Sequence, residues 1–590
     1  MNRLKNLNRL ETETFDVCII GGGATGVGCA LDATLRGLKV ILIEKNDFGS
    51  ATSSRSTKLF HGGVRYLEQA VKKLDLEQFR MVYKALHERR TLIKNAPHLA
   101  QPLALMTPCY SWFEGFYYNI GLKIYDFLAG KTNLAPSEWL SKEGALKRMP
   151  QLKADRLRSA VLYYDGQFDD ARYTLALAKT ASEKGATLVN HVEALEFSQN
   201  TEGSSDVGFR MSDVGGGRND LQNVTSETEK ARIEIPNPKS ESATGSLKSL
   251  KVRDALKNQE MTLRAKVFIN ATGPFSDAIR LMANPNAGKR MRVSKGVHLV
   301  LPRDSMSNDT ALLIPKTDDG RVIFVIPWQR RLLVGTTDEE CDLTEKDVLL
   351  EKDDVDYLLK YVHRYFSKTF KSDQIRSGFG GLRPLLQADP TSDSKSLVRD
   401  HEVEVCKKTG LISIMGGKWT TYRLMAKDTI DKVEEILRGP ISDCKTADQL
   451  LMGAEDWNHD DYKMMARRYA VPEYVTRRLN RRYGSEAHKV LALCWKDGTL
   501  RQAILPGSPM LKCEIVHACV EEMACTLRDV CARRLGLELT DWQLTLDSLE
   551  AIALVMQEVL WFSSEEREKM VADYRAELLG FMKTADVKAL

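Results

Sequence analysis

Phe15-Asp-Val-Cys-Ile-Ile20, then Gly21-Gly22-Gly23-Ala24-Thr25-Gly26, and later Val40-Ile-Leu-Ile43-Glu44, is the stretch that decides the fold. Residues 15–20 are a short apolar run typical of a buried strand, and a G-x-G-x-x-G pattern follows at once. Residues 27–36 have a helical pattern that ends at Gly37, and 38–43 form a second apolar run closed by Glu44. The order strand, glycine turn, helix, strand and acid predicts a βαβ unit that binds a dinucleotide.

Each glycine of such a unit has its own physical role. Gly21 allows the tight turn, Gly23 lets a pyrophosphate approach the backbone, and Gly26 lets the helix pack closely on the strand. The helix N-terminus attracts the phosphates, and Glu44 is expected to bond a ribose hydroxyl. This unit alone does not separate NAD from FAD.

Length and composition restrict the class of protein. With 590 residues the chain should hold roughly three folding units, and a net charge of +5 is too small to indicate nucleic acid binding. The eleven cysteines are scattered, odd in number and without a C-x-x-C motif, so we predict neither a disulfide framework nor a metal site. Cys513, Cys519, Cys525 and Cys531 recur every six residues in what we read as one helical segment, where core packing is the expected role.

The first ten residues carry three cations and no acid. They indicate either a short remnant of a mitochondrial presequence or a disordered basic tail, and we assign 1–14 as a basic N-terminal tail. No apolar run reaches the length of a membrane span. Residues 101–130 are crowded with aromatic side chains and hold Lys123, a composition that suits a membrane interface. A buried subdomain core or a dimer contact would explain the same composition.

The remaining segments divide by their patterns. Residues 199–260 are polar and nearly free of aromatics, which predicts a flexible insertion. Residues 292–337 alternate like an antiparallel sheet, and the pattern from 443 to 590 is helical. Ser563 and Glu566 form a capping box that opens the last helix. Two further glycine turns occur at Gly380-Gly381 and Gly416-Gly417-Lys418, and the second follows an apolar run, as an anion site would.

Several motifs together resemble one flavoprotein family. They are Thr52-Ser-Ser-Arg-Ser-Thr-Lys-Leu-Phe-His-Gly-Gly-Val-Arg-Tyr-Leu67, Asn270-Ala-Thr-Gly273, Phe324-Val-Ile-Pro-Trp328, Gly335-Thr-Thr-Asp338 and Gly416-Gly-Lys-Trp-Thr-Thr-Tyr-Arg423. The chain is similar to the FAD-dependent glycerol-3-phosphate dehydrogenases, and residues 69–81 look more like the mitochondrial members. The match runs from about residue 15 to near the end of the chain, without the insertion.

The resemblance implies an α/β fold with added helices. We expect a discontinuous Rossmann-like FAD-binding domain, an antiparallel-sheet substrate domain and a C-terminal helical domain. The FAD-binding domain would comprise 15–100, 165–198, 261–290 and 376–442. The substrate or membrane-facing domain would comprise 101–164 and 291–375, and the helical domain 443–590.

The family reaction is the oxidation of sn-glycerol 3-phosphate to dihydroxyacetone phosphate, with electrons passing through FAD to a membrane quinone. By position, His298 would be the base, which suits a histidine near neutral pH, and Arg383 would polarise the reacting oxygen. Arg65 and Lys418 would bind the phosphate, with Tyr66 and Thr336 assisting. A packed histidine on a strand and surface ion pairs of the arginines are the structural alternatives.

The same carry-over predicts the residues that hold FAD. They are Gly21, Gly23, Ala24, Thr25, Gly26, Glu44, Ser53, Ser54, Ser56, Thr57, Lys58, His61, Gly62, Val192, Thr272, Gly273, Gly416 and Gly417. The expected setting is the mitochondrial inner membrane, with peripheral attachment, and a homodimer is a candidate assembly. An oxidase that passes electrons to oxygen and releases peroxide is the alternative function, and a flavin-binding interaction module without turnover is a second.

Overall fold

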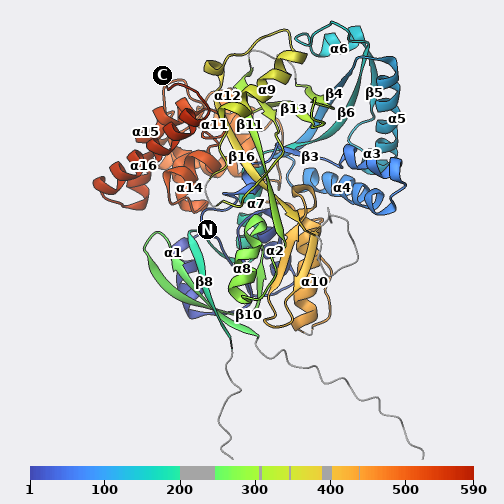
Figure 1. Ribbon diagram of the computed structural model, residues 1–590. Helices are drawn as coiled ribbons and strands as arrows, with labels where there is room; N and C mark the ends of the chain where they lie inside the picture. Colours follow the sequence, from blue (N-terminus) through green and yellow to red (C-terminus); the bar gives the residue numbers. More distant parts are fainter. Residues whose placement is uncertain (200–245, 304–308, 345–346, 388–400, 438, 590) are drawn as a thin grey trace, which may run out of the picture.

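The computed structural model describes residues 1–199, 246–303, 309–344, 347–387, 401–437 and 439–589, apart from the side chains of Arg65, Gln69 and Val71. Two sheets organise these residues (Figure 1). The first has the order β17-β18-β10-β1-β2-β7, with β8 and β9 added beside β10. Its strands are β1 (Thr14–Ile20), β2 (Val40–Ile43), β7 (Thr187–Val189), β8 (Val192–Gln199), β9 (Leu247–Asp254), β10 (Gln259–Asn270), β17 (His401–Val405) and β18 (Ile412–Gly416).

The core of this first sheet is parallel, because β18, β10, β1, β2 and β7 pair in the same direction. Both of its faces are covered, which explains the continuous apolar runs. Val17 and Ile19 of β1 pack with α2 (Ala24–Leu35), α7 (Asp170–Glu183) and α10 (Tyr422–Leu437). Cys18 and Ile20 point to the other face, which α1 (Arg3–Thr12) and α8 (Ser276–Ala283) cover.

The second sheet has the order β15-β11-β14-β13-β12-β4-β6-β3 and is mostly antiparallel, with β16 beside β11 and β5 beside β6. Its strands are β3 (Leu59–Phe60), β4 (Ala100–Cys109), β5 (Glu138–Ser141), β6 (Ser159–Phe168), β11 (Met291–Pro302), β12 (Ala311–Ile314), β13 (Ile323–Trp328), β14 (Arg331–Gly335), β15 (Glu339–Cys341) and β16 (Ser377–Leu386). It lies above the first sheet in Figure 1. The helices α3 (Val64–Lys73), α4 (Leu76–Asn95) and α5 (Trp112–Ala129) lie on its right-hand side there, and α6 (Lys142–Arg148) and α9 (Lys352–Tyr365) near its top.

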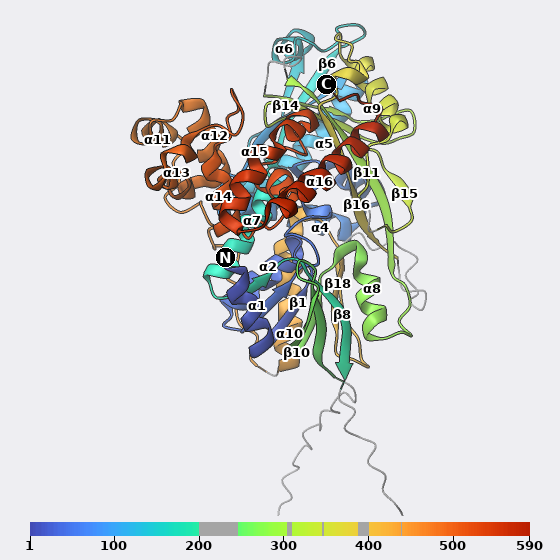
Figure 2. The same cartoon turned by 90° about the vertical axis from the view of Figure 1, so that its left-hand side faces the viewer.

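The C-terminal part of the chain is helical, as predicted. It contains α11 (Tyr462–Tyr469), α12 (Glu473–Tyr483), α13 (Ala487–Lys496), α14 (Lys512–Glu521), α15 (Trp542–Leu560) and α16 (Ser564–Thr584). Figure 2 shows α11, α12 and α13 projecting to one side of the molecule. The capping box of Ser563 and Glu566 is confirmed at the start of α16. Buried ion pairs, among them Arg172 with Glu522 at 2.7 Å, join this part to α7 of the first unit.

The expectation of a disordered N-terminal tail is wrong, because Arg3–Thr12 form α1. Leu10 is fully buried against the first sheet, and the guanidinium of Arg3 donates to the Asp254 carboxylate at 2.7 Å. Asn2 caps the helix by accepting from the amide of Lys5. Burial of one apolar face therefore orders a segment whose composition by itself indicated a tail.

Four boundaries also differ from the sequence prediction. The predicted insertion 199–260 is too long, since β9 and the start of β10 lie within 247–260 and pair as a hairpin. Residues 200–245 lie outside the described part. β16, assigned to the FAD-binding domain, pairs with β11 in the second sheet. The apolar pattern of residues 66–93 predicts one helix, but the structure divides it at Leu74, which has a φ of +52°. The four C-terminal cysteines do not share one helix, because Cys525 lies in a loop between α14 and the π-helix Asp529–Arg534.

Candidate active site

The carboxyl ends of the parallel strands bring four distant segments to one edge. Ile20 of β1 lies opposite Asn270 of β10 and Ile43 of β2, and Asn270 lies opposite Ser413 of β18. The glycine turn, Glu44, Thr272-Gly273 and Gly416-Gly417 follow these ends directly. Ligands bind at this edge in sheets of this kind, so the predicted cofactor residues converge where the topology requires.

The glycine turn leaves no room for side chains. Gly21 has a φ of +110°, and a Cβ on Gly26 would lie 1.9 Å from the carbonyl oxygen of Gly21. Gly23 is the N-cap of α2 and has no side chain to cover the N–H groups of the first turn. The amide of Ala24 donates to the Ser53 hydroxyl at 2.9 Å. The end of α2 is therefore a short backbone cradle for an anion.

Glu44 lies across this turn. Its carboxylate accepts from the amide of Gly22 at 2.6 Å and from the amide of Asn46 at 2.9 Å. Burial raises the pKa of Glu44 above its ordinary value even though both amides act in the opposite direction. Val192 is next to it, since the Val192 amide donates to the Glu44 carbonyl at 2.8 Å. Because this N–H already donates to Glu44, an adenine could contact only the carbonyl or the side chain of Val192.

The polar loop 51–62 crosses from the first sheet to the second. The indole N–H of Trp419 donates to the Ser53 carbonyl at 2.9 Å, which ties the loop to the Gly416-Gly417 turn. Lys58 is fully buried, and its ammonium donates to Asp170 and to the Ser54 carbonyl, both at 2.6 Å. The hydroxyl of Ser56 donates to the same Asp170 at 2.7 Å. The side chains of Ser56 and Lys58 are thus engaged within the protein and fix the loop.

His298 lies on β11, facing this loop. It is 2% exposed, and its Nε2 lies 2.9 Å from the Thr57 hydroxyl. Its ring stacks on Phe379 with centroids 5.0 Å apart, and a Cβ on Gly335 would lie 2.2 Å from it. Burial, with Arg383 and Lys58 as nearby cations, lowers the pKa of His298 to about 3. The imidazole is therefore neutral at physiological pH.

Arg383 lies on β16, and its Cα partner on β11 is Ser294, four residues before His298. Its guanidinium donates to the Thr336 hydroxyl at 3.1 Å and to the Asp338 carboxylate at 2.9 Å. Burial lowers the pKa of Arg383, while Asp338 and the Tyr66 hydroxyl act in the opposite direction. Arg383 is thus near the imidazole of His298, with Thr336 bound to its guanidinium.

Lys418 and Tyr66 meet across the loop. The ammonium of Lys418 lies 3.7 Å from the centre of the Tyr66 ring, a cation–π contact. Lys418 borders a small hollow that opens to solvent. Its lining residues are His61, Gly62, Gly63, Met81, Ala85, Gly417, Lys418 and Thr421. Burial lowers the pKa of His61, and Lys418 adds to this effect. The side chain of Arg65 lies outside the described part, although its backbone is in the first turn of α3.

The remaining predicted residues lie around the same edge. The Thr272 hydroxyl donates to the Asn270 side chain at 2.7 Å, and the Thr25 hydroxyl lies 3.9 Å from the sulfur of Met425. Gly273, Gly416 and Gly417 have φ values of +58°, +71° and +79°. A Cβ on Gly417 would lie 2.4 Å from the same sulfur. Glycine backbone therefore follows the ends of three strands, β1, β10 and β18, at this edge of the sheet.

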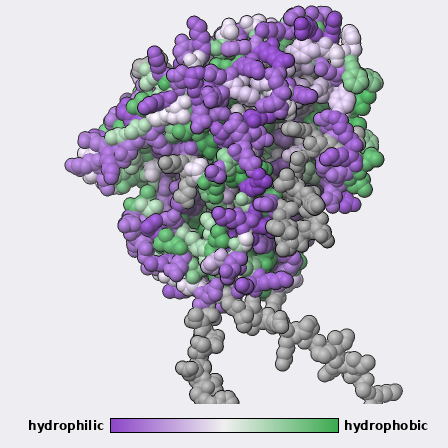
Figure 3. All heavy atoms as spheres, in the orientation of Figure 1, coloured by the Kyte–Doolittle hydropathy of each residue, from purple (hydrophilic) through white to green (hydrophobic). Residues whose placement is uncertain are grey.

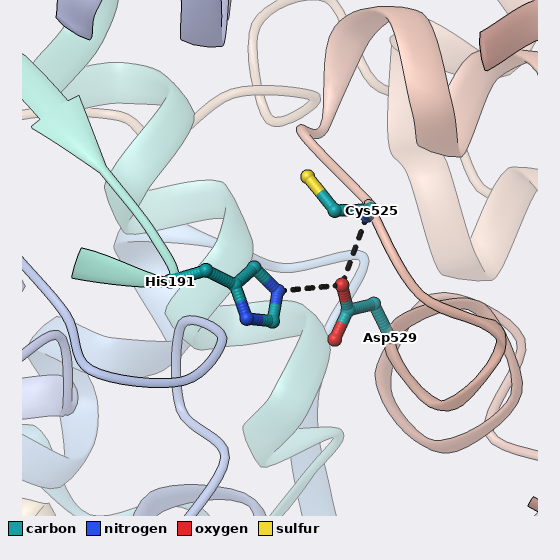
Figure 4. A group of neighbouring side chains, drawn as sticks. All are labelled: His191, Cys525 and Asp529. Carbon is teal, nitrogen blue, oxygen red and sulfur yellow. Dashed lines mark hydrogen bonds and ion pairs between the residues drawn. The ribbon is translucent and has the colours of Figure 1, made fainter. Parts of the chain in front are cut away.

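A second group of ligand-type side chains lies elsewhere among the described residues. Ligand atoms of His191, Cys525 and Asp529 lie within 4.8 Å of one another (Figure 4). The Asp529 carboxylate already accepts from His191 Nε2 and from the amides of Cys525 and Thr526, all at 2.9 Å, and from Arg533 at 2.7 Å. Figure 4 shows the Cys525 amide, not its sulfur, meeting this carboxylate. We interpret the group as a buried ion pair that caps a helix.

Sequence reasoning missed several residues of the site. Asp170 holds Ser56 and Lys58, Phe379 supports His298, and Met81 lines the hollow. The sequence held a signal for Asp170. Asp169 alone is enough to cap α7, so the second acid of the Asp169-Asp170 pair is left for another role. The other two carry no local signal.

A glycine turn at the end of a parallel sheet, a cradle without Cβ atoms and a neutral imidazole in a second sheet fit a flavin dinucleotide and its substrate. The fold and the site define a flavin-dependent oxidoreductase. Residues 16–224 and 240–423 match the FAD dependent oxidoreductase family, and 444–567 match the C-terminal domain of alpha-glycerophosphate oxidase.

Similar proteins identify the family within this class of flavin-dependent oxidoreductases. The probable mitochondrial glycerol-3-phosphate dehydrogenase of Caenorhabditis elegans is 41% identical over 95% of this chain and 73% of its own length. The Arabidopsis thaliana mitochondrial enzyme of that name is 35% identical over 95% and 85%. The glycerol-3-phosphate dehydrogenase of Bacillus halodurans, solved with FAD, has a TM-score of 0.74 at 27% identity over 97% of this chain and 96% of that one. The chain belongs to the family of FAD-dependent glycerol-3-phosphate dehydrogenases, and its cofactor is FAD.

Proposed function

We propose that this protein oxidises sn-glycerol 3-phosphate to dihydroxyacetone phosphate and passes the electrons to a membrane quinone. The observation that carries the proposal is the contact of a buried, neutral His298 on the second sheet with Thr57, in the loop that follows the dinucleotide unit, with Arg383 near the imidazole. The names of the relatives support the substrate. Bound FAD supplies the hydride acceptor.

The substrate phosphate is assigned to Lys418 and Arg65. A dianion needs several fixed donors, and Lys418 is held in place by its contact with the Tyr66 ring. Arg65 follows Gly62-Gly63 by two residues, in the first turn of α3, so the N-terminal end of that helix faces the same region. Tyr66 orients Lys418 and is assigned to assist in binding the phosphate.

His298 is assigned as the base. Its neutral imidazole accepts the proton of the C2 hydroxyl while the C2 hydrogen leaves as hydride. The Thr57 hydroxyl at Nε2 fixes the ring orientation in the absence of substrate. Arg383, held by Asp338, stabilises the negative charge that develops on the substrate oxygen, and Thr336 orients the guanidinium.

FAD would be held by the predicted set. The pyrophosphate would lie on the backbone cradle between Gly21 and Gly26, with Glu44 toward the adenosine ribose. Ser53, Thr57 and His61 would follow the ribityl chain toward the flavin ring, next to the hollow.

The membrane part of the proposal rests on α5. Its outward side carries large apolar side chains, with Phe113 78% and Phe127 83% exposed. Further exposed apolar side chains lie beside them, on α4 and α5 and between α3 and α4: Leu74, Leu76, Tyr83, Trp112, Phe116 and Ile120. Green spheres gather at the right-hand edge of Figure 3, where α5 lies in Figure 1. Such a surface marks an interaction site, and the exposed Lys72, Lys73, Arg80 and Lys84 nearby favour anionic headgroups.

Among the helices that the structure describes, none is long and apolar enough to cross a bilayer. We therefore propose peripheral attachment through α5. The curated relatives are named mitochondrial, which supports a mitochondrial setting, and we propose the inner membrane as the surface. A homodimer through the same apolar face is the competing use of this surface.

The test is anaerobic mixing of the holoenzyme with glycerol 3-phosphate, glycerol and glycerol 2-phosphate. Only glycerol 3-phosphate should bleach the visible absorption of the flavin. No bleaching would leave a flavin-binding module without turnover. Reoxidation then separates the acceptors: rapid reoxidation by a soluble quinone with little peroxide supports the dehydrogenase, and one peroxide per substrate in air supports the oxidase.

A further inference from the structure

The helix α5 has two different sides. Its outward side is the exposed apolar surface described above. Its inward side consists of Gly115, Leu122, Tyr125 and Ala129, which recur at helical spacing and are buried. Tyr125 is the one of these four with a hydroxyl, and it is 1% exposed. A polar group in this position needs a partner inside the protein.

The Tyr125 hydroxyl has two partners, one on each side. It accepts from the backbone amide of Gly62 at 2.7 Å and donates to Asp165 Oδ1 at 2.9 Å. Asp165 Oδ1 also accepts from the Arg89 guanidinium at 2.6 Å. Arg89 and Asp165 are themselves buried, and the Arg89 guanidinium lies 5.6 Å from the centre of the Tyr125 ring. A continuous buried chain thus runs from Arg89 on α4 through Asp165 on β6 and Tyr125 on α5 to Gly62.

Gly62 links two parts of the candidate site. It lies between His61, which borders the hollow, and the first turn of α3, which carries Tyr66. A Cβ on Gly62 would lie 2.5 Å from a methyl carbon of Leu86 and 2.7 Å from the Tyr125 hydroxyl. The loop is therefore pressed against α4 and α5, and the amide of Gly62 is directed at a single acceptor.

We propose that Tyr125 is a positioning residue that holds the His61–Gly63 loop, and thereby joins the exposed helix α5 to the flavin and substrate side of the site. The proposal rests on the proposed function for its kinetic effect, but the hydrogen bond to Gly62 does not. Removing the hydroxyl deletes the hydrogen bond from the Gly62 amide and the one to the Asp165 carboxylate, and the buried Gly62 amide loses its acceptor. The loop should loosen, while the phenyl ring still fills the same space.

Tyr125→Phe is the test, with Tyr163→Phe as the matched control. Tyr163 is also buried, and its ring meets that of Tyr125 edge-on with centroids 6.4 Å apart, but its hydroxyl is not part of the chain to Gly62. Two quantities are measured on FAD-loaded enzyme. They are amide hydrogen exchange of the peptide around residues 60–67, and the rate of anaerobic flavin reduction at low and at saturating glycerol 3-phosphate.

In Tyr125→Phe, exchange of the 60–67 peptide should become about tenfold faster and the reduction rate at low substrate about tenfold slower, the effect of one buried hydrogen bond. Exchange elsewhere and the Tyr163→Phe control should match wild type. Wild-type exchange in the 60–67 peptide of Tyr125→Phe, or an equal change in Tyr163→Phe, would overturn the proposal. If glycerol 3-phosphate fails to reduce even the wild-type flavin, the proposed function fails, whereas the exchange comparison still decides the role of Tyr125.

Discussion

The Nε2 atom of His298 and the hydroxyl of Thr57 lie 2.9 Å apart, although 241 residues separate them in the chain. His298 belongs to the second sheet, and Thr57 belongs to the loop that follows the dinucleotide unit. This contact therefore joins the second sheet to the loop at the edge of the first.

His298→Ala should lower the rate of flavin reduction at saturating glycerol 3-phosphate by about 10²-fold or more, because the proton acceptor is lost. Stopped-flow reduction without oxygen measures this directly. His459→Ala, at an exposed position in the helical region, is the control and should behave as wild type. An unchanged rate in His298→Ala would remove the imidazole from the mechanism.

Lys418→Ala should raise the KM for glycerol 3-phosphate by about 30- to 150-fold, equivalent to about 2–3 kcal/mol of lost charged hydrogen bonding. Arg65→Ala should act in the same direction. The matched control is Lys427→Ala on α10, where the lysine pairs with Asp431 four residues on. Wild-type affinity in Lys418→Ala would show that the phosphate assignment is wrong.

Gly26→Ala should give protein without FAD, since the new Cβ would lie 1.9 Å from the Gly21 carbonyl oxygen and must displace the turn. Gly144→Ala on α6, where the nearest atom would be at 3.6 Å, should keep full flavin content. The ratio of absorbance at 450 and about 280 nm in purified protein reports the flavin content. Full occupancy in Gly26→Ala would contradict the assigned cradle.

Replacement of Phe113, Phe116 and Phe127 by serine should weaken binding to anionic phospholipid vesicles by about 10³-fold or more, because each fully buried side chain of this size is worth about 1.5–3 kcal/mol. Flavin reduction in solution should be unchanged. Leu554→Ser with Trp561→Ser removes exposed apolar side chains from α15 and its end and serves as the control. If the triple variant sediments with vesicles like wild type, α5 is not the contact; if wild type alone dimerises without lipid, the competing use of the surface holds.

The buried His98 should make stability depend on pH. Burial, with Arg172 nearby, lowers the pKa of His98 to about 3, so the folded protein keeps this ring neutral while the unfolded chain protonates it near pH 6.5. Stability is retained above about pH 6.5 and is lost as pH falls toward 3, by at most about 1.4 kcal/mol per pH unit. The loss of denaturation midpoint between pH 7 and 5 should be smaller in His98→Gln, whereas exposed His459→Gln should keep the wild-type difference. Equal losses in wild type and His98→Gln would refute this account.

Local patterns carried much of the fold. The βαβ unit follows from residues that are neighbours in sequence, since strand, turn and helix propensities act over a few residues. The capping box at Ser563 is equally local. The glycine turns at Gly21, Gly273 and Gly416 could be placed because backbone with a positive φ favours glycine.

The misplaced boundaries have one cause in common. Whether Arg3–Thr12 is a tail or a helix depends on the sheet surface that receives Leu10, and whether β16 joins one sheet or the other depends on β11. Neither partner is within reach of a local pattern. The same holds for Lys58, whose ammonium the sequence directed to the cofactor and the fold directs to Asp170.

The sequence by itself determined that a dinucleotide unit begins the chain and that further segments of the FAD-binding domain follow later. It also determined which residue types could bind a phosphorylated alcohol. Only the tertiary structure decided that His298 meets Thr57, that Tyr125 meets Gly62, and that one side of α5 stays exposed. The physical reason is that hydrogen bonds and burial are made between surfaces, and a chain brings distant residues to one surface only when all its elements are packed together.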